Sequence, residues 1–223
     1  MIKSATIGQI AAALPQALDY FNDLGIDYCC GGNRKLLDVL KEKRLNEDAV
    51  INELIKLEEQ AKSLTVTKNF LHMSSYDLCD YIVNVHHAYL YKTLPEISEI
   101  IPAVMWAHGE HHPELFEVGT LFGTLRGDLE QHLIKEELFL FPALKQLTGE
   151  DKIISLSTDI ISEHEGAGEI LHKLEDITND FKPPSDACKT YIKLYGLLSE
   201  MNNDIHRHIH LENNILLREY DNR

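Results

Sequence analysis

The chain has 223 residues, and its 36 acidic side chains outnumber its 21 basic ones to give a formal net charge of -15. This length has room for one large domain and a small one, and the negative charge repels phosphate backbones, so we expect no direct binding of nucleic acid. No stretch approaches the ~20 apolar residues of a membrane span, and residues 1–6 lack a signal-peptide pattern. We therefore expect a cytoplasmic protein that does not enter a membrane.

The first part of the chain predicts a small helical domain over residues 1–62. Short amphipathic patterns run over residues 9–24, 36–43 and 47–62. Pro15 and the pair Gly31-Gly32 interrupt them. Residues 63–73, which are rich in β-branched and polar side chains, then predict an interdomain linker.

The rest of the chain, residues 74–223, predicts an all-α four-helix bundle. Its long helical patterns cover residues 74–101, 113–147, 150–180 and 185–219. No strand pattern competes with them, and short connections favour antiparallel neighbours. The economical fold is therefore an up-down-up-down bundle, preceded by the small helical domain.

Two of these helices carry the same pair of residues, a histidine followed four positions later by a glutamate. The pairs are His132 with Glu136 and His208 with Glu212. Residues four apart lie on one face of a helix, and in both helices this is the apolar face that a bundle buries. An uncompensated buried charge costs several kcal/mol or more, and neither apolar face carries a lysine or arginine. Both glutamates therefore need another positive partner.

The other two helices each add a histidine to an apolar face, His87 in the first and His164 in the third. Four imidazoles and two carboxylates at one level match two iron ions about 3.5 Å apart, with both carboxylates bridging and two histidines on each iron. The alternatives are hydrogen-bonded core histidines without metal, and a structural zinc site, which six ligands fit poorly because zinc prefers four. The predicted ligands are His87, His132, Glu136, His164, His208 and Glu212.

The motif Asp27-Tyr-Cys-Cys-Gly-Gly32, followed by a bundle with these histidines and glutamates, resembles the Repair of Iron Centres family over essentially the whole chain. The resemblance implies a hemerythrin-like bundle that holds two iron ions in a non-haem di-iron centre, with the metal positions on the same six residues. One departure is Leu216-Leu-Arg-Glu219, where the family usually has Leu-Phe-Pro after the last ligand. This departure changes none of the predicted ligands.

By this resemblance the protein repairs iron-sulfur clusters damaged by nitrosative and oxidative stress. Its partners would be damaged iron-sulfur proteins, with nitric oxide or oxygen species as small ligands, and a homodimer is expected because the family is commonly dimeric. The residues do not choose between iron donation and nitric oxide chemistry. They also leave open the resting oxidation state and an oxo bridge between the irons. A repair protein or iron donor is favoured over a turnover enzyme.

Two other functions would use the same metals. A hemerythrin-like protein that binds or senses oxygen or nitric oxide is one, although oxygen carriers typically have a richer histidine set, in which a histidine takes the place of the glutamate in such a pair. A nitric oxide reductase or ferroxidase is the other. Turnover with a defined electron donor would separate this second alternative from repair.

Cys29 and Cys30 are candidates for a thiol role in iron transfer. A disulfide between neighbouring cysteines needs a strained eight-membered ring, so free thiols are expected. The alternative is that both pack the small domain as small apolar residues. Cys79 and Cys188 fall in helical segments and are expected to serve packing.

Further histidines receive weaker predictions. His87 is preferred over its neighbour His86 as a ligand because of its spacing to the leucines that follow. His206 and His210, another pair four residues apart, are expected on a solvated face of their helix.

Three acidic side chains lie close in sequence to the predicted centre or its helices. Glu163 and Asp80 are candidates to orient histidines through hydrogen bonds. Glu137 directly follows a predicted ligand and is expected to point elsewhere, because successive residues of a helix do not share a face.

Overall fold

The computed structural model describes residues 2–63, 70–147 and 149–220, and within this part every regular element is a helix. The one bridge between extended residues there joins Thr6 and Lys35. These observations confirm the all-α fold. Most of the predicted linker, at residues 64–69, lies outside the described residues. Among the helices that are described, none combines the length and the apolar composition that crossing a membrane requires.

The chain divides into two compact units. The bundle unit comprises Cys79–Ile205, and the terminal unit comprises the described residues of Met1–Leu78 together with those of His206–Arg223. The last long helix begins in the bundle unit and ends in the terminal unit. The domain boundaries that the sequence suggests, at residues 62 and 74, stay predictions.

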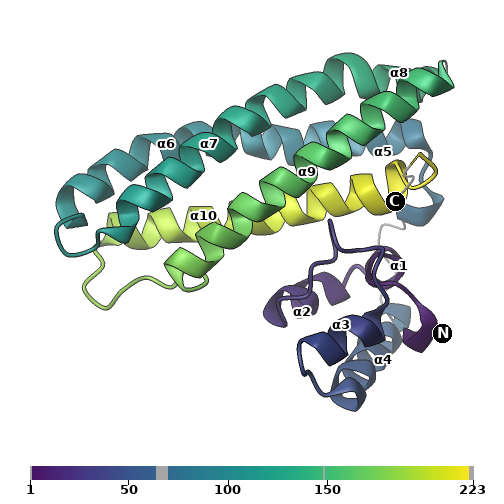
Figure 1. Ribbon diagram of the computed structural model, residues 1–223, viewed down its shortest axis with the longest axis horizontal. Helices are drawn as coiled ribbons and strands as arrows, with labels where there is room; N and C mark the ends of the chain where they lie inside the picture. Colours follow the sequence, from purple (N-terminus) through teal and green to yellow (C-terminus); the bar gives the residue numbers. More distant parts are fainter. Residues whose placement is uncertain (1, 64–69, 148, 221–223) are drawn as a thin grey trace. The chain divides into compact units, whose positions relative to one another are not determined.

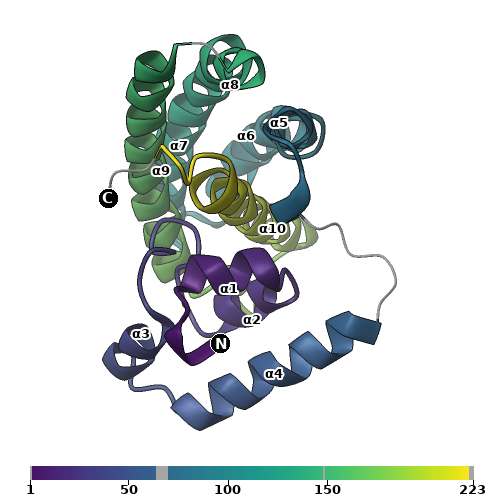
Figure 2. The ribbon, with the colours of Figure 1, turned by 90° about the vertical axis from the view of Figure 1, so that its right-hand side faces the viewer.

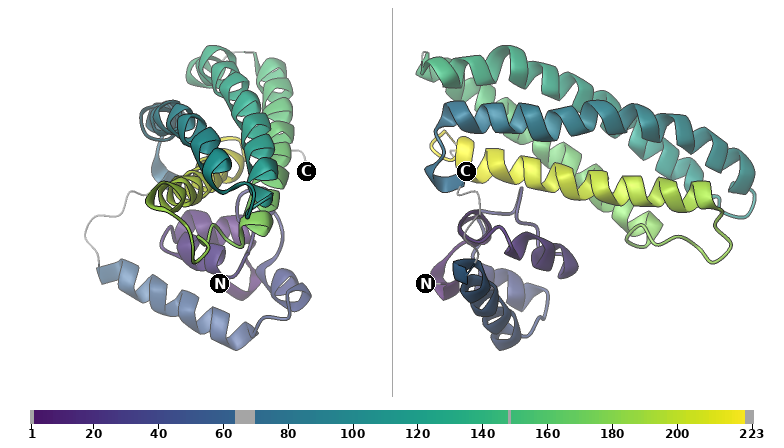
Figure 3. Two further views of the ribbon diagram at one scale, coloured as in Figure 1. Left: turned by 90° about the vertical axis from the view of Figure 1, so that its left-hand side faces the viewer. Right: turned by 180° about the vertical axis from the view of Figure 1, so that it is seen from behind.

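Four long helical segments run side by side in the bundle unit (Figures 1 and 3). The first consists of α5 (Ser75–Ile82, from residue 79 on) and α6 (Ala88–His108), and the second of α7 (Glu114–Lys135) and α8 (Phe141–Gln146). The third is α9 (Glu150–Thr178), and the fourth is residues 189–205 of α10 (Lys189–Leu211). Successive segments run in opposite directions, which confirms the up-down-up-down bundle.

Apolar side chains at helical spacing fill the centre of the bundle unit. Leu90, Leu94 and Ile97 of α6 are buried, and so are Leu125 of α7 and Leu171 of α9. Burying one aliphatic side chain of this size contributes about 1.5–3 kcal/mol. The burial of these residues fixes the rotation of each helix about its own axis. This rotation determines which polar side chains point into the bundle.

Left-handed backbone conformations end the helices near the predicted breaks. Leu147, just after α8, has φ 51°, and Gly149, just before α9, has φ 75°. Asn179, which caps the end of α9, also has φ 51°. A residue in this conformation cannot continue a right-handed helix, and glycine and asparagine adopt it at the least cost.

In the described part of the chain, two short π-helical turns interrupt long helices and a third follows α10, and each contains a predicted metal ligand at one of its ends. In the bundle unit, η3 (Val83–His87) ends at His87 and η4 (Glu136–Leu140) begins at Glu136. In the terminal unit, η5 (Glu212–Leu216) begins at Glu212. Such turns accommodate an extra residue and are often found at functional sites. The sequence analysis treats all three as α-helix, because apolar periodicity does not reveal a single wide turn.

The α-helices of the terminal unit that precede residue 64 are labelled in Figure 2. They are α1 (Ile7–Ala13), α2 (Ala17–Asp23), α3 (Leu36–Glu42) and α4 (Glu47–Ser63). The predicted helix over residues 9–24 is thus two helices, separated at Pro15. Buried Phe21, Leu36, Leu40 and Leu54 supply its core.

Candidate metal centre

Four of the predicted ligands belong to the bundle unit, and all four are buried. His87 lies at the end of η3, His132 on α7, Glu136 at the start of η4 and His164 on α9. One carboxylate oxygen of Glu136 lies 3.3 Å from Nε2 of His87, and the other lies 3.3 Å from Nε2 of His132. The Nε2 atoms of His132 and His164 are 3.1 Å apart. Glu136 therefore divides its two oxygens between two imidazoles, as a bridging carboxylate does.

Two outer carboxylates orient two of these imidazoles. Nδ1 of His87 lies 2.8 Å from Oε1 of Glu137, and Nδ1 of His132 lies 2.9 Å from Oε2 of Glu163. A carboxylate at Nδ1 favours a proton on that nitrogen. Nε2 then carries a lone pair that can bind a metal ion, as in histidines that are metal ligands. The prediction for Glu163 is confirmed. The prediction that Glu137 points elsewhere is wrong, because Glu137 reaches a histidine on a neighbouring helix.

Glu163 is held in its ionised form. The hydrogen bond from His132, assisted by Lys135, lowers the pKa of Glu163 to about 2 against the opposing effect of burial. Asp80, the other carboxylate predicted to orient a histidine, instead pairs with Lys145 on α8, so that prediction is wrong. His86, the neighbour of His87, lies 2.9 Å from the carboxylate of Asp204.

The remaining two predicted ligands belong to the terminal unit. His208 and Glu212 lie one helical turn apart where α10 passes into η5, and both are buried. Nε2 of His208 is 3.1 Å from Oε1 of Glu212. The second His-x-x-x-Glu pair thus has the same internal arrangement as the first.

The predicted ligands form two groups that can each hold a metal ion. One contains His87, Glu136, His208 and Glu212, and the other contains His132, Glu136, His164 and Glu212. In each group the ligand atoms lie within 4.8 Å of one another. Glu136 and Glu212 occur in both, and each is a buried carboxylate that needs a proton or a cation to compensate its charge. The imidazole nitrogens and carboxylate oxygens of this donor set suit iron.

His206 and His210 are buried, so the prediction of a solvated face is wrong for both. The ring of Tyr28 packs edge-on against them, with ring centroids 6.3 Å and 5.7 Å apart. Burial lowers the pKa of His210 to about 4, which keeps its imidazole neutral near pH 7. No signal in the sequence pattern of their own helix predicts this burial, because it depends on Tyr28, which is far away in the sequence.

The two candidate thiols are adjacent, and neither forms a disulfide bond. Sγ of Cys29 lies 3.7 Å from Sγ of Cys30, and the Cys29 side chain is buried whereas Cys30 is partly exposed. The Asp27 carboxylate accepts hydrogen bonds from the backbone N–H groups of Cys29, Cys30 and Gly31, at 2.9–3.0 Å. The neighbouring Cys30, burial and Asp27 together raise the pKa of Cys29. Cys30 is therefore the more accessible thiol of the pair.

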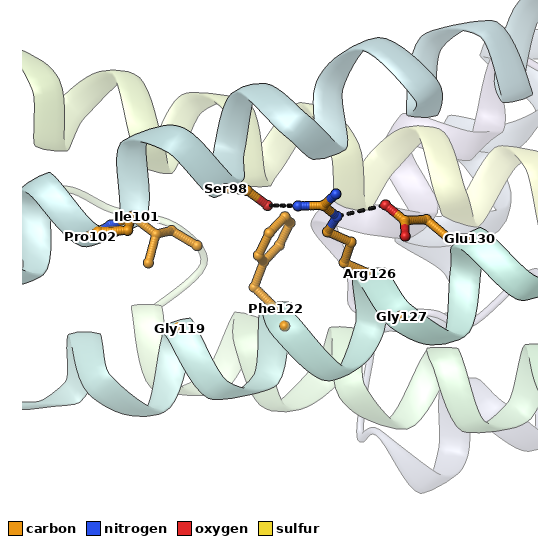
Figure 4. A pocket seen from close by; sticks show the side chains of 9 residues that line it. Ser98, Ile101, Pro102, Gly119, Phe122, Arg126, Gly127 and Glu130 are labelled. Carbon is orange, nitrogen blue, oxygen red and sulfur yellow. Dashed lines mark hydrogen bonds and ion pairs between the residues drawn. The ribbon is translucent and has the colours of Figure 1, made fainter.

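A surface pocket of about 360 Å³ lies between α6 and α7, away from all of these residues. Arg126 crosses it, donating hydrogen bonds to Ser98 at 2.6 Å and to Glu130 at 2.7 Å (Figure 4). Gly123 and Gly127 line the same pocket. No predicted ligand or candidate thiol borders it, so it is separate from the candidate centre.

Two families match consecutive parts of the chain. ScdA_N, a domain of unknown function, matches residues 3–58, and the hemerythrin HHE cation binding domain matches residues 80–220. The second match includes all six predicted ligands. The first includes Cys29 and Cys30.

Known proteins are similar to the chain over nearly its whole length. The iron-sulfur cluster repair protein ScdA of Staphylococcus haemolyticus is 28% identical over 218 residues, which cover 96% of each chain. The iron-sulfur cluster repair protein YtfE of Escherichia coli O81 is 34% identical over 211 residues, and that of Citrobacter koseri is 32% identical over 210 residues; both alignments cover 94% of this chain and 93% of the relative. With a ScdA-type N-terminal part, a hemerythrin-type cation-binding part and these relatives, the chain belongs to the Repair of Iron Centres family.

Proposed function

We propose that this protein repairs iron-sulfur clusters damaged by nitrosative and oxidative stress, using two iron ions held inside the bundle. The observation that carries the proposal is the pair of four-residue groups that share Glu136 and Glu212. Similarity to proteins named for iron-sulfur cluster repair supports the biological role. The proposed ligands are His87, His132, Glu136, His164, His208 and Glu212.

When bound, a non-haem di-iron centre supplies an exchangeable iron ion and a coordination position for a small ligand such as nitric oxide or dioxygen. The residues of the chain determine how firmly the metal is held. Glu136 and Glu212 would hold the metals through their carboxylates, and protonation of either would weaken that hold, which suits iron donation. Glu137 and Glu163 lie at Nδ1 of His87 and His132 and favour a proton on that nitrogen, which would leave Nε2 of each ring to bind the metal.

We assign the thiols of Cys29 and Cys30 to the transfer step, in which they would accept iron or a nitrosyl group. Cys30 is partly exposed, whereas Cys29 is buried and its raised pKa keeps it as the thiol. The first contact with a partner therefore falls to Cys30. The partners of this step are damaged iron-sulfur proteins, and the protein acts as an iron donor in the cytoplasm, as a homodimer.

The match to the hemerythrin HHE cation binding domain favours one second function, reversible binding or sensing of oxygen or nitric oxide. This function would use the same six ligands. It predicts a stable adduct with oxygen or nitric oxide that is released intact when the gas is removed. Iron donation instead predicts loss of iron from the protein when a damaged cluster is present.

Elemental mass spectrometry on protein from iron-replete cells tests the proposal first. We expect two irons per chain in the wild type and less in the single variants Glu136→Ala and Glu212→Ala. The same samples are then assayed for reactivation of a nitric-oxide-damaged iron-sulfur enzyme, and repair should fall together with iron content. Full repair by an iron-free variant would refute the proposal, and substoichiometric zinc in its place would favour a structural metal site.

A further inference from the structure

The π-helical turn η5 begins with the proposed ligand Glu212. The next two residues, Asn213 and Asn214, form hydrogen bonds to the loop that contains Cys29 and Cys30. We call residues 28–32, Tyr28-Cys-Cys-Gly-Gly32, the thiol loop. The side-chain amide of Asn214 donates to the carbonyl oxygens of Tyr28 at 3.1 Å and Cys29 at 3.2 Å. The amide of Asn213 donates to the carbonyl of Cys29 at 3.4 Å. All of these residues belong to the terminal unit.

Two glycines leave the space that the Asn214 amide occupies. A Cβ atom added to Gly8 would lie 2.1 Å from Oδ1 of Asn214, and one added to Gly32 would lie 2.2 Å from the same atom. Gly8 also donates its backbone N–H to the carbonyl of Gly32 at 2.8 Å. The Asn214 amide is therefore enclosed between α1 and the thiol loop, and any side chain at either glycine would displace it.

One carboxylate ties the backbone of the thiol loop together, so a displacement of the carbonyl groups of the loop also displaces its thiols. The Asp27 carboxylate accepts the backbone N–H groups of three consecutive loop residues and also lies 3.2 Å from the Cys29 sulfur. The carbonyl groups of the same stretch face the asparagines of η5. A displacement of η5 is thus transmitted to Cys29 and Cys30 through the peptide groups that carry them.

We propose that Asn214 is a positioning residue that couples the metal-binding state of Glu212 to the accessibility of the Cys29 and Cys30 thiols. This inference rests on the proposed function, because it takes Glu212 as a metal ligand. A metal on Glu212 would fix the first residue of η5, and Asn214 two residues later would then hold the thiol loop in place, with Cys29 buried and Cys30 only partly exposed. By linkage, a partner that draws the loop away from Asn214 weakens metal binding by the same factor. Contact of the thiols with a damaged protein would thereby favour release of iron.

Alkylation rates of the individual cysteines test the coupling on the full chain. The iron-free and the Fe(II)-loaded protein are treated anaerobically with N-ethylmaleimide, and modification of each cysteine is followed by peptide mass spectrometry. We expect iron to slow alkylation of Cys30 about five-fold or more in the wild type, the lower end of typical coupling. Exposed Cys188 serves as the internal reference, and its rate should not change.

Three variants separate the role of Asn214 from a general destabilisation of the terminal unit. In Asn214→Ala, alkylation of Cys30 should be fast with or without iron. Gly32→Ala should have the same effect in the wild-type background and little further effect in Asn214→Ala, because the three atoms nearest to its added Cβ all belong to the missing amide. Asn46→Ala is the matched control, since Asn46 accepts the backbone N–H of Ala49 at the start of α4 and does not touch the loop.

Iron content is measured on the same samples, so that the two proposals fail separately. A wild type that holds two irons but alkylates equally fast in both states overturns the coupling and leaves the proposed function standing. An Asn214→Ala variant with wild-type rates in both states, and wild-type circular dichroism, also overturns the coupling. A wild type that binds no iron refutes the proposed function and the coupling together, and the iron-free rates of wild type and Asn214→Ala then decide whether the asparagine holds the loop at all.

Discussion

Nδ1 of His132 on α7 lies 2.9 Å from the carboxylate of Glu163 on the neighbouring helix α9. Residues that hold the outer nitrogen of a metal-binding histidine typically contribute 10–100-fold in metal affinity. We therefore expect Glu163→Ala to weaken iron binding by about that factor. Equilibrium competition with a chelator measures it. Glu169→Ala removes an exposed carboxylate from the same helix and should leave the affinity unchanged.

Removal of iron should destabilise the protein, because the buried carboxylates of Glu136 and Glu212 then lack a compensating cation. Ligand present at 100 times its dissociation constant stabilises by about 2.7 kcal/mol, so iron should raise the Tm by several degrees. In Glu212→Gln the iron-free protein should melt about 2–4 °C above the iron-free wild type, and iron should add little. Exposed Glu219→Gln is the control. An iron-free Glu212→Gln that melts below the wild type would favour core histidines and glutamates that need no metal.

Gly123 and Gly127 on α7 are sites for stabilising substitution, because a Cβ atom at either would meet nothing within 4 Å. Replacing a mid-helix glycine with alanine contributes about 0.5–1 kcal/mol. Each change should therefore raise the free energy of unfolding by about this amount, measured by urea denaturation. Gly119→Ala is the contrasting variant, since its Cβ would lie 3.0 Å from Sδ of Met105. Equal gains at all three positions would contradict the crowding at Gly119.

His112 should titrate above its ordinary pKa of 6.5, because the Asp186 and Glu114 carboxylates stabilise its charged form. A raised folded-state pKa means that the pair stabilises the fold below the unfolded pKa and that this contribution disappears as pH rises through the folded pKa. NMR titration of the His112 ring should show the higher value, and Asp186→Asn should lower it. The stability difference between wild type and Asp186→Asn should be larger at about pH 5.5 than at about pH 9. A control, Glu110→Gln, should leave the titration of His112 unchanged.

Cys188 should be the most reactive thiol at neutral pH. The backbone N–H of Tyr191 and the His108 side chain lower its pKa to about 7, and the residue is exposed just before α10. Alkylation at Cys188 should therefore reach half its maximal rate near pH 7. In His108→Ala the midpoint should move up toward 9.0, the ordinary value. Buried Cys79 should react only on unfolding, and a Cys188 midpoint unchanged by the substitution would show that His108 has no part in it.

The periodicity of the sequence predicts the helical fold and identifies which face of each helix is buried. It does so because the position of a residue on a helix depends on its own segment alone, with 3.6 residues per turn. The spacing of apolar residues around His132 with Glu136 and His208 with Glu212 therefore suffices to assign both pairs to buried faces. For the same reason His87 and His164 could be added as single residues on apolar faces.

The tertiary structure decided which side chains on different segments meet and where the helices contain a wider turn. Glu137 reaches His87 from another segment, and His206 and His210 are buried because Tyr28, far away in the sequence, packs on them. The π-helical turns widen the helix locally, and no particular residue type in the sequence marks them. The hold of Asn214 on the thiol loop needs two glycines from separate segments to leave room for one amide. A sequence pattern records the face of each helix, whereas the partner that meets that face is determined only when the packed chain brings distant segments together.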